Sequence, residues 1–222
     1  APYPTGGIWR NDVTRTDEQL GVFGEINFDL VPDLWSMSLG ARYYDVEVDL
    51  TGSARGGFGS KDNNGDGVMP APVLNPAANN LTTLFSTSGA GPDKATADGW
   101  IPKFSVSYTP TNSKLYYATY SEGFRPGILN RPGGTVSGNY TVPYAVATDE
   151  VKNYELGWKL TSDDRRMRFN GNVFMVEIEK LQTTIFDPSI ANLFFSENAA
   201  DAEVYGLEGD ITYLPPSIEG LT

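Results

Sequence analysis

Three features are missing from this chain of 222 residues, and each absence excludes a class of site or protein. Cysteine is absent, which removes disulfide bonds and thiolate metal sites. Histidine is absent as well, so His-based catalytic triads and the usual zinc sites are excluded. No stretch approaches the roughly 20 consecutive apolar residues that a transmembrane helix needs. If the chain meets a bilayer, it must therefore cross it as β-strands.

Positive charge is also scarce. The 16 Lys and Arg residues are outnumbered by 28 Asp and Glu, which gives a net charge of −12. This balance argues against a nucleic-acid partner, because phosphates require a basic surface. An acidic surface attracts cations instead, although soluble loops and a polar lumen explain the same composition. Aromatic residues make up 12% of the chain, so it has enough large side chains to fold and is not disordered.

Four segments alternate apolar and polar residues, the pattern of a β-strand with one face of each kind. In the last of them, Leu207 and Ile211 share one face while Glu208 and Asp210 share the other. The predicted strands are residues 19–30, 34–49, 100–109, 114–124, 151–162, 167–186 and 203–214. The segment 114–124 has apolar residues on both faces and cannot be oriented. In 167–186 the apolar set changes face at Val176, which predicts a β-bulge or the point where the strand leaves a membrane.

Short and long connections alternate between these strands. The short ones are 31–33, 110–113, 162–166 and 215–217, and the long ones are 51–99, 125–150 and 187–202. Outer-membrane barrels have short periplasmic turns and long extracellular loops. Long strands flanked by Tyr and Trp support the same assignment. The sequence therefore predicts an all-β fold, an antiparallel transmembrane β-barrel. A soluble β-sandwich also alternates and remains an alternative.

Several strings resemble the barrel of TonB-dependent outer-membrane receptors. They are YATYSEGFRPG (117–127), NYELGWKL (153–160) and AEVYGLEGD (202–210), with GVFGEINFDL (21–30) and LGARYY (39–44) at the upstream hairpin. Their order and spacing match those of that family. The resemblance implies a barrel fragment, about seven to eight strands of a 22-stranded barrel. The whole chain, 1–222, is expected to be part of the barrel domain, with the plug domain absent from it.

The resemblance also implies a function. It predicts part of an active importer in the bacterial outer membrane that takes up a siderophore, a vitamin or an oligosaccharide, and it implies no enzymatic activity. The implied partners are outer-membrane lipid, the rest of the barrel, the plug domain, the TonB complex acting through the plug, and a small-molecule ligand. Two alternatives are a passive porin-like channel and a soluble β module that binds calcium and carbohydrate. The ligand-contacting residues stay unknown.

One loop carries a motif with explicit site chemistry. Asp62, Asn64 and Asp66 alternate and precede Gly67, as in the first half of a calcium-binding loop. The match then fails, because Val73 stands where a bidentate carboxylate is needed. A cluster of turn-forming residues that binds no ion explains the same residues. No cofactor is required by this sequence, and calcium within loop 51–99 is the one candidate.

Other candidate residues have weaker signals. Glu177 and Glu179 share a strand face, where paired carboxylates could do acid–base work, but a solvated rim explains them better. Six charged residues on predicted inward faces could line a transport path or form a solvated wall: Arg42, Lys103, Glu155, Lys159, Glu208 and Asp210. Ligand contacts are expected from segments 51–99 and 125–150, since surface loops carry recognition. Four aromatic residues could offer stacking surfaces there: Tyr140, Tyr144, Phe194 and Phe195.

Overall fold

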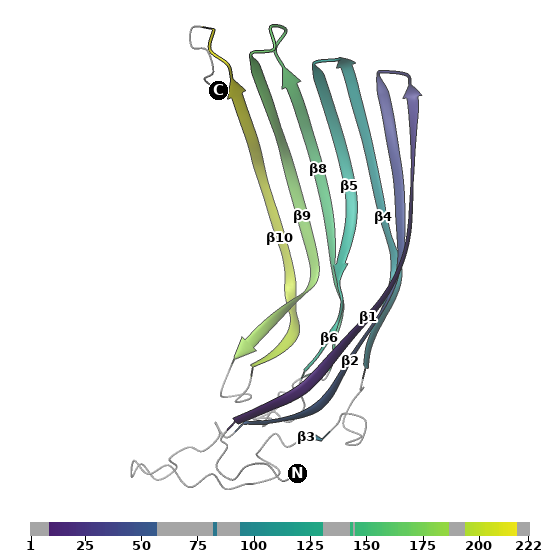
Figure 1. Cartoon of the computed structure of the whole chain (residues 1–222), viewed down its shortest axis with the longest axis vertical. Coiled ribbons are helices and arrows are strands. Elements are labelled where there is room, and N and C mark those ends of the chain that lie inside the picture. The colour runs from purple at the N-terminus through teal and green to yellow at the C-terminus, as the bar shows by residue number, and fades with distance from the viewer. Residues whose placement is uncertain are drawn as a thin grey trace, which may run out of the picture.

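The computed structural model describes residues 9–56, 82–83, 94–130, 143, 145–186 and 194–216. These residues form one long, curved antiparallel sheet and a small hairpin (Figure 1). The strands are β1 (Trp9–Val31), β2 (Trp35–Gly56), β3 (Thr82–Thr83), β4 (Lys94–Thr111), β5 (Lys114–Arg125), β6 (Ile128–Leu129), β7 (Ala145–Val146), β8 (Asp149–Thr161), β9 (Met167–Phe186) and β10 (Phe194–Tyr213). Within these ranges no helix is long and apolar enough to cross a membrane.

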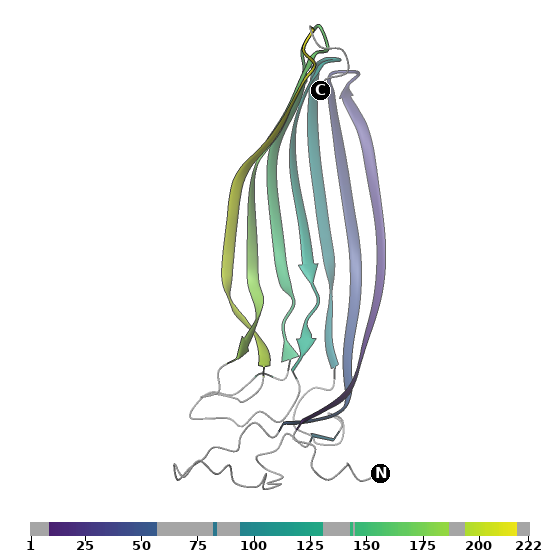
Figure 2. The same cartoon turned by 60° about the vertical axis from the view of Figure 1, so that its left-hand side comes forward.

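The main sheet has the order β1-β2-β4-β5-β8-β9-β10, so each long strand pairs with its neighbours in the chain. Every pairing is antiparallel, β3 adds to β2, and β6 pairs only with β7. The sheet is strongly curved and does not close on itself, and β1 and β10 lie at its two edges (Figure 2). The predicted all-β, antiparallel barrel fragment is confirmed.

All described tight turns lie at one end of the sheet, and the ends of the longer connections lie at the other (Figure 1). The first end carries the Val31↔Trp35, Thr111↔Lys114 and Thr161↔Arg168 pairs. Neighbouring turns bond to one another there: the Thr109 N–H donates to the Leu34 carbonyl over 2.8 Å. The predicted asymmetry of short and long connections is therefore present. The end with the longer connections is called the mouth from here on.

Several strands are longer than the sequence predicts, and the difference lies at the mouth. β1 begins at Trp9 instead of residue 19, and β10 begins at Phe194 instead of residue 203. The prediction of a long loop over 187–202 is therefore wrong, because most of it is strand. Backbone pairing continues there after the simple alternation has ended, and the alternation was the signal used. β9 has the predicted bounds.

Polarity inverts along β2, and Tyr43 marks the point. Between Trp35 and Tyr43, one face carries apolar residues such as Leu39, and the opposite face carries polar ones such as Ser38. Beyond Tyr43 the first face carries three acidic residues, Asp45, Glu47 and Asp49, whereas the opposite face carries Val46, Val48 and Leu50. These last three side chains are buried. The two faces thus exchange character at one level of the strand.

The same inversion occurs on β9. Val173 and Met175 lie on the face of Leu39, whereas Val176 and Ile178 lie on the opposite face. The change predicted at Val176 is therefore the emergence of the strand from its apolar surroundings. A bulge exists as well, slightly further on: Lys180 has a φ of 55°, and the β9–β10 register shifts opposite it. The Lys180 N–H donates to Asp201 Oδ1 over 2.9 Å, which stabilises the bulge.

Two rows of aromatic rings bound the apolar face between them. Trp35 packs on Tyr108 near the turns, with ring centroids 4.5 Å apart, and Tyr43 packs on Trp100 at the level of the inversion, 5.4 Å apart. Trp35 to Tyr43 is a stretch of nine residues, counting both ends. A tilted strand of an outer-membrane barrel needs about 9–11 residues to cross the apolar core between the aromatic girdles. The face that carries Leu39 therefore has the dimensions of a lipid-facing surface.

The small β6–β7 hairpin identifies the inner face. It contacts β2 and β4 as well as β10, although β10 is separated from β4 by three strands of the sheet. A short segment can touch both only from inside the curve of the sheet. Val146 of β7 is only 2% exposed, as is Val48 of β2. The face that carries Ser38, Arg42 and Val48 is therefore the inner one.

Candidate functional site

The inner wall between the two aromatic rows carries ordered polar contacts. Lys103 Nζ lies 3.0 Å from Glu25 Oε2, across Gly40 of the intervening strand. A Cβ on Gly40 would lie 3.5 Å from Glu25 Oε2 and 3.6 Å from Lys103 Cβ, which are ordinary contact distances, so the ion pair lies directly over this residue. The Arg42 guanidinium lies over Gly21 on the neighbouring strand in the same way.

A second polar group lies further along the wall. Glu155 of β8 accepts hydrogen bonds from the Tyr117 hydroxyl and from Asn172 Nδ2, the latter over 2.9 Å. Asn170 Nδ2 donates to Asp210 Oδ2 over 3.2 Å. All six residues predicted for a transport path lie on the inner face by strand register: Arg42, Lys103, Glu155, Lys159, Glu208 and Asp210. Their placement on one wall agrees with the prediction, while a role in transport stays a prediction.

Glycines opposite aromatic rings shape the wall. The Tyr117 ring covers Gly157 so closely that a Cβ there would lie 2.3 Å from Tyr117 Cζ. Phe174 covers Gly206 similarly, with a hypothetical Cβ 2.7 Å from Phe174 Cζ. The missing Cβ at each glycine lets the ring lie flat against the sheet. The glycines in NYELGWKL and AEVYGLEGD therefore have a packing reason.

The acidic pair on β9 faces outward at the mouth. Glu179 forms an ion pair with Lys152 of β8, and Lys180 Nζ lies 3.6 Å from Glu150 Oε1. Glu177 pairs in register with Lys152 and with Glu203. These side chains form a mixed-charge rim, as the solvated alternative in the sequence analysis expects.

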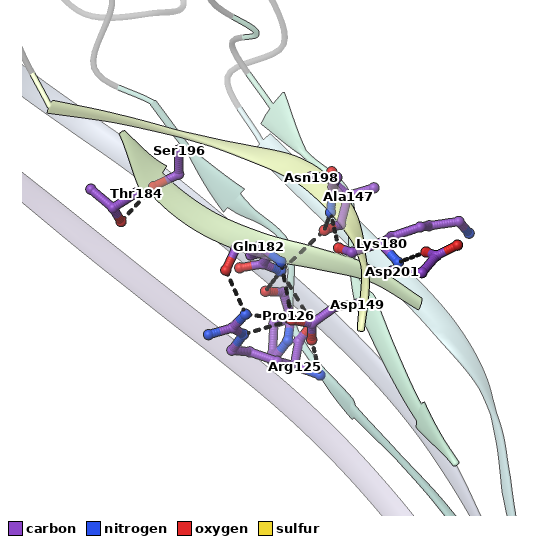
Figure 3. Close-up of polar contacts among 10 residues, drawn as sticks. All are labelled: Arg125, Pro126, Ala147, Asp149, Lys180, Gln182, Thr184, Ser196, Asn198 and Asp201. Carbon is purple, nitrogen blue, oxygen red and sulfur yellow. Dashed lines mark hydrogen bonds and ion pairs between the residues drawn. The ribbon is translucent and has the colours of Figure 1, made fainter. Parts of the chain in front are cut away.

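A buried network ties the start and the end of the β5–β8 connection to β9 (Figure 3). Asp149, only 2% exposed, accepts from the Arg125 N–H over 3.1 Å and from Arg125 Nε over 3.0 Å, and it forms an ion pair with Arg125 Nη2. Arg125 Nη2 also donates to the Gln182 carbonyl over 3.0 Å. Gln182 Nε2 in turn donates to the carbonyls of Pro126, over 2.8 Å, and Ala147, over 3.0 Å. One β9 residue thus holds both ends of the connection.

Two asparagines extend the network to β10. Asn198 accepts from the Ala147 N–H over 2.8 Å and donates to the Ala147 carbonyl over 3.0 Å (Figure 3). Asn130, which is buried, donates to the carbonyls of Pro143, over 2.7 Å, and Ser196, over 2.6 Å. It also accepts from the Ser196 N–H over 2.7 Å. These bonds join the two stems of the connection to each other and to β10.

The sequence did not point to these anchoring side chains. Gln182, Asn130 and Asn198 lie far in sequence from most of their partners, and a lone amide carries no periodic signal. Gly127 is the one residue whose type reflects this packing, because a Cβ there would lie 2.5 Å from the Val146 carbonyl oxygen. A glycine after Pro126 is therefore consistent with a close approach of two backbones, but it does not identify the strands that supply the anchoring amides.

Other predicted site residues have mixed outcomes. Asp62, Asn64 and Asp66 lie outside the described residues, so the calcium site stays a prediction. Tyr140 and Tyr144 also lie outside them. Phe194 is 63% exposed at the mouth and packs on Phe186, with ring centroids 4.8 Å apart, whereas Phe195 is buried. Within the described residues no group of three or more Asp or Glu side chains could hold a metal ion.

Comparison with known proteins agrees with this geometry. The family model "TonB dependent receptor-like, beta-barrel" matches residues 1–218. The ferric yersiniabactin uptake receptor FyuA from Yersinia pestis superposes with a TM-score of 0.61 and 16% identity, over 92% of this chain and 25% of that chain. The copper transporter OprC also gives a TM-score of 0.61, at 10% identity, over 90% of this chain and 27% of its own.

The FrpB iron transporter from Neisseria meningitidis gives a TM-score of 0.56 at 15% identity, over 92% of this chain and 24% of that chain. The chain thus spans about a quarter of the solved structures that it matches, and at these identities the likeness shows the fold alone. The family match, by contrast, extends over nearly the entire sequence. The chain therefore belongs to the family of TonB-dependent receptor-like β-barrels, which places it in the outer membrane of a Gram-negative bacterium.

Proposed function

We propose that this chain forms part of the barrel wall of an outer-membrane importer that takes up an iron chelate in a TonB-dependent way. The observation that carries the proposal is the family match over residues 1–218. Receptors of similar fold are named for ferric yersiniabactin and for iron. Because a copper transporter is also among them, a compound of another metal is the second candidate ligand class.

The described geometry supports a role as a wall. Between the two aromatic rows, a mostly polar inner face follows β1, β2, β4, β5, β8, β9 and β10, and an apolar outer face backs it. A solute that crosses the membrane along this wall meets ion pairs such as Lys103–Glu25 and amide groups such as Asn172. We propose that a plug domain outside these 222 residues fills the lumen and transmits the pull of TonB.

Growth under iron limitation tests the proposal. The gene for the receptor that contains this chain is deleted, and growth is measured in medium with an iron chelator and a panel of ferric siderophores. We expect growth on at least one siderophore to be lost, to return with a plasmid copy, and to require TonB.

Two results would contradict this function. If the deletion leaves growth unchanged on every iron source tested, the proposal of an iron chelate as the ligand is refuted. Uptake that persists without TonB would instead support the passive porin-like channel. The soluble calcium and carbohydrate-binding module finds no support, because the family match and the two aromatic rows both indicate a membrane wall.

A further inference from the structure

The mouth contains a packed interior. Val46, Val48 and Leu50 of β2 point inward, and each is at most 6% exposed. Val146 of β7 is 2% exposed and Phe195 of β10 is 4% exposed, in the region where the β6–β7 hairpin contacts β2 and β10. Apolar side chains on an inner face are buried only if protein covers them, and the β6–β7 hairpin of the β5–β8 connection contacts β2, β4 and β10 in this region.

Side-chain amides hold this connection at three points, and those of Gln182 and Asn130 are buried. Gln182 bonds to Pro126 and Ala147, and Asn198 bonds to Ala147 (Figure 3). Asn130 bonds to Pro143 and Ser196. Each amide bonds to backbone groups, so the contacts fix the path of the main chain and not merely a rotamer. Buried amides are costly to leave unpaired, which makes the arrangement specific.

From these contacts we propose that the two described stems of the β5–β8 connection, residues 126–130 and 145–148, are fixed elements of the inner mouth. Asn130, Gln182 and Asn198 are then positioning residues, because they hold these two stems over the inner face. Their role in ligand recognition rests on the proposed import function, whereas the anchoring itself does not.

Hydrogen–deuterium exchange on the purified full receptor in detergent tests the anchoring. The variant Asn130→Asp keeps the acceptor for the Ser196 N–H but loses both donors and sets a negative charge against two carbonyl oxygens. We expect the amides of residues 128–130 and 145–147 to exchange about tenfold faster or more. The heat-dependent gel mobility of the barrel should not change.

Asn170→Asp is the matched control, because it makes the same chemical change on β9 at a site away from the connection. It should leave exchange in 128–130 and 145–147 as in the parent. Asn198→Asp, at an exposed position, is the second variant in case Asn130→Asp lowers the yield of folded receptor. Unchanged exchange at the connection in Asn198→Asp and in any folded Asn130→Asp would overturn the proposal, as would an equal increase in the control.

Uptake kinetics separate positioning from a general structural role. For the ⁵⁵Fe-loaded siderophore that the parent receptor imports, the half-saturating concentration should rise several-fold in Asn130→Asp at equal surface abundance and unchanged maximal rate. An unchanged half-saturating concentration would leave the anchor without a role in recognition. If no siderophore is imported by the parent, the proposed function fails, while the exchange result still decides whether the connection is anchored.

Discussion

The membrane-crossing part of the sheet and the mouth use the same strands with opposite polarity. Below Tyr43, Leu39 faces out and Ser38 faces in, whereas above it Glu47 faces out and Val48 faces in. The backbone pairing of β1 with β2 keeps one register through both parts, from Trp9↔Gly56 to Asp29↔Ser36. Secondary structure therefore does not reveal the boundary between the membrane-crossing part and the mouth. The boundary is revealed by the polarity of the residues on each face. Lipid lies outside the lower part, while water lies outside the upper part and protein lies inside it.

The largest expected effect tests the lower part. Leu39→Arg places a charge at the centre of the apolar face, and we expect the free energy of unfolding to fall by about 2–4 kcal/mol. Refolding of the full receptor into lipid vesicles measures this loss. Ser38→Arg, at the same depth on the inner face, should cost far less. The same contrast is expected between Leu156→Arg or Leu207→Arg, on the outer face, and Thr212→Arg, on the inner face. Equal losses of unfolding free energy on the two faces would refute the assigned orientation.

A smaller effect is expected where glycine meets an aromatic ring. Gly157→Ala would place a methyl group 2.3 Å from Tyr117 Cζ, so the ring and its bond to Glu155 must shift. We expect a loss of about 1–3 kcal/mol in the same refolding assay. Gly24→Ala is the control, since nothing lies within 4 Å of its hypothetical Cβ. Similar losses for both variants would mean that backbone freedom, and not the ring contact, sets the cost.

At the mouth, Asp149→Ala should act locally. It removes the acceptor for three Arg125 groups and leaves the arginine, about half exposed, without its carboxylate. Because water screens Arg125, we expect only about 1–2 kcal/mol of local opening free energy to be lost. Hydrogen exchange should accelerate at 125–130 and 145–149 but not in β4 between residues 100 and 108. Acceleration throughout β4 would show that the mouth and the membrane part are not separable.

The smallest effect concerns the turn after β8. The Ser162 hydroxyl and the Arg166 N–H donate to Asp164 and hold the pKa of its carboxyl below the usual value. Because the folded pKa is lowered, the stabilisation is present above the unfolded value of about 4 and is lost as the pH falls through the folded pKa. The protection factor of the Arg166 amide, which corrects for the intrinsic pH dependence of exchange, should therefore fall at acidic pH in the parent but not in Asp164→Asn. Equal pH dependence in both would exclude Asp164 as its source.

Alternation made the membrane part predictable from sequence, because one side chain in two must face lipid there. β8, at Asp149–Thr161, lies within two residues of its predicted bounds for this reason. At the mouth the simple alternation ends, so the start of β10 at Phe194 was missed. The anchor of Asn130, Gln182 and Asn198 was missed because its partners come from distant strands. Charged residues that alternate with apolar ones, such as Glu208 and Asp210, were placed correctly on the inner face.

The polarity inversion at Tyr43 is the central claim, and a nitroxide scan of β2 tests it most directly. Single labels at successive positions from 36 to 49 of the full receptor in lipid bilayers report access to oxygen, which partitions into lipid, and to a water-soluble nickel complex. The account predicts oxygen maxima at Met37, Leu39 and Ala41, and none beyond Tyr43, where Asp45 and Glu47 become accessible to nickel. Oxygen maxima that continue through residues 45–49, or that fall on Ser36 and Ser38, would contradict it.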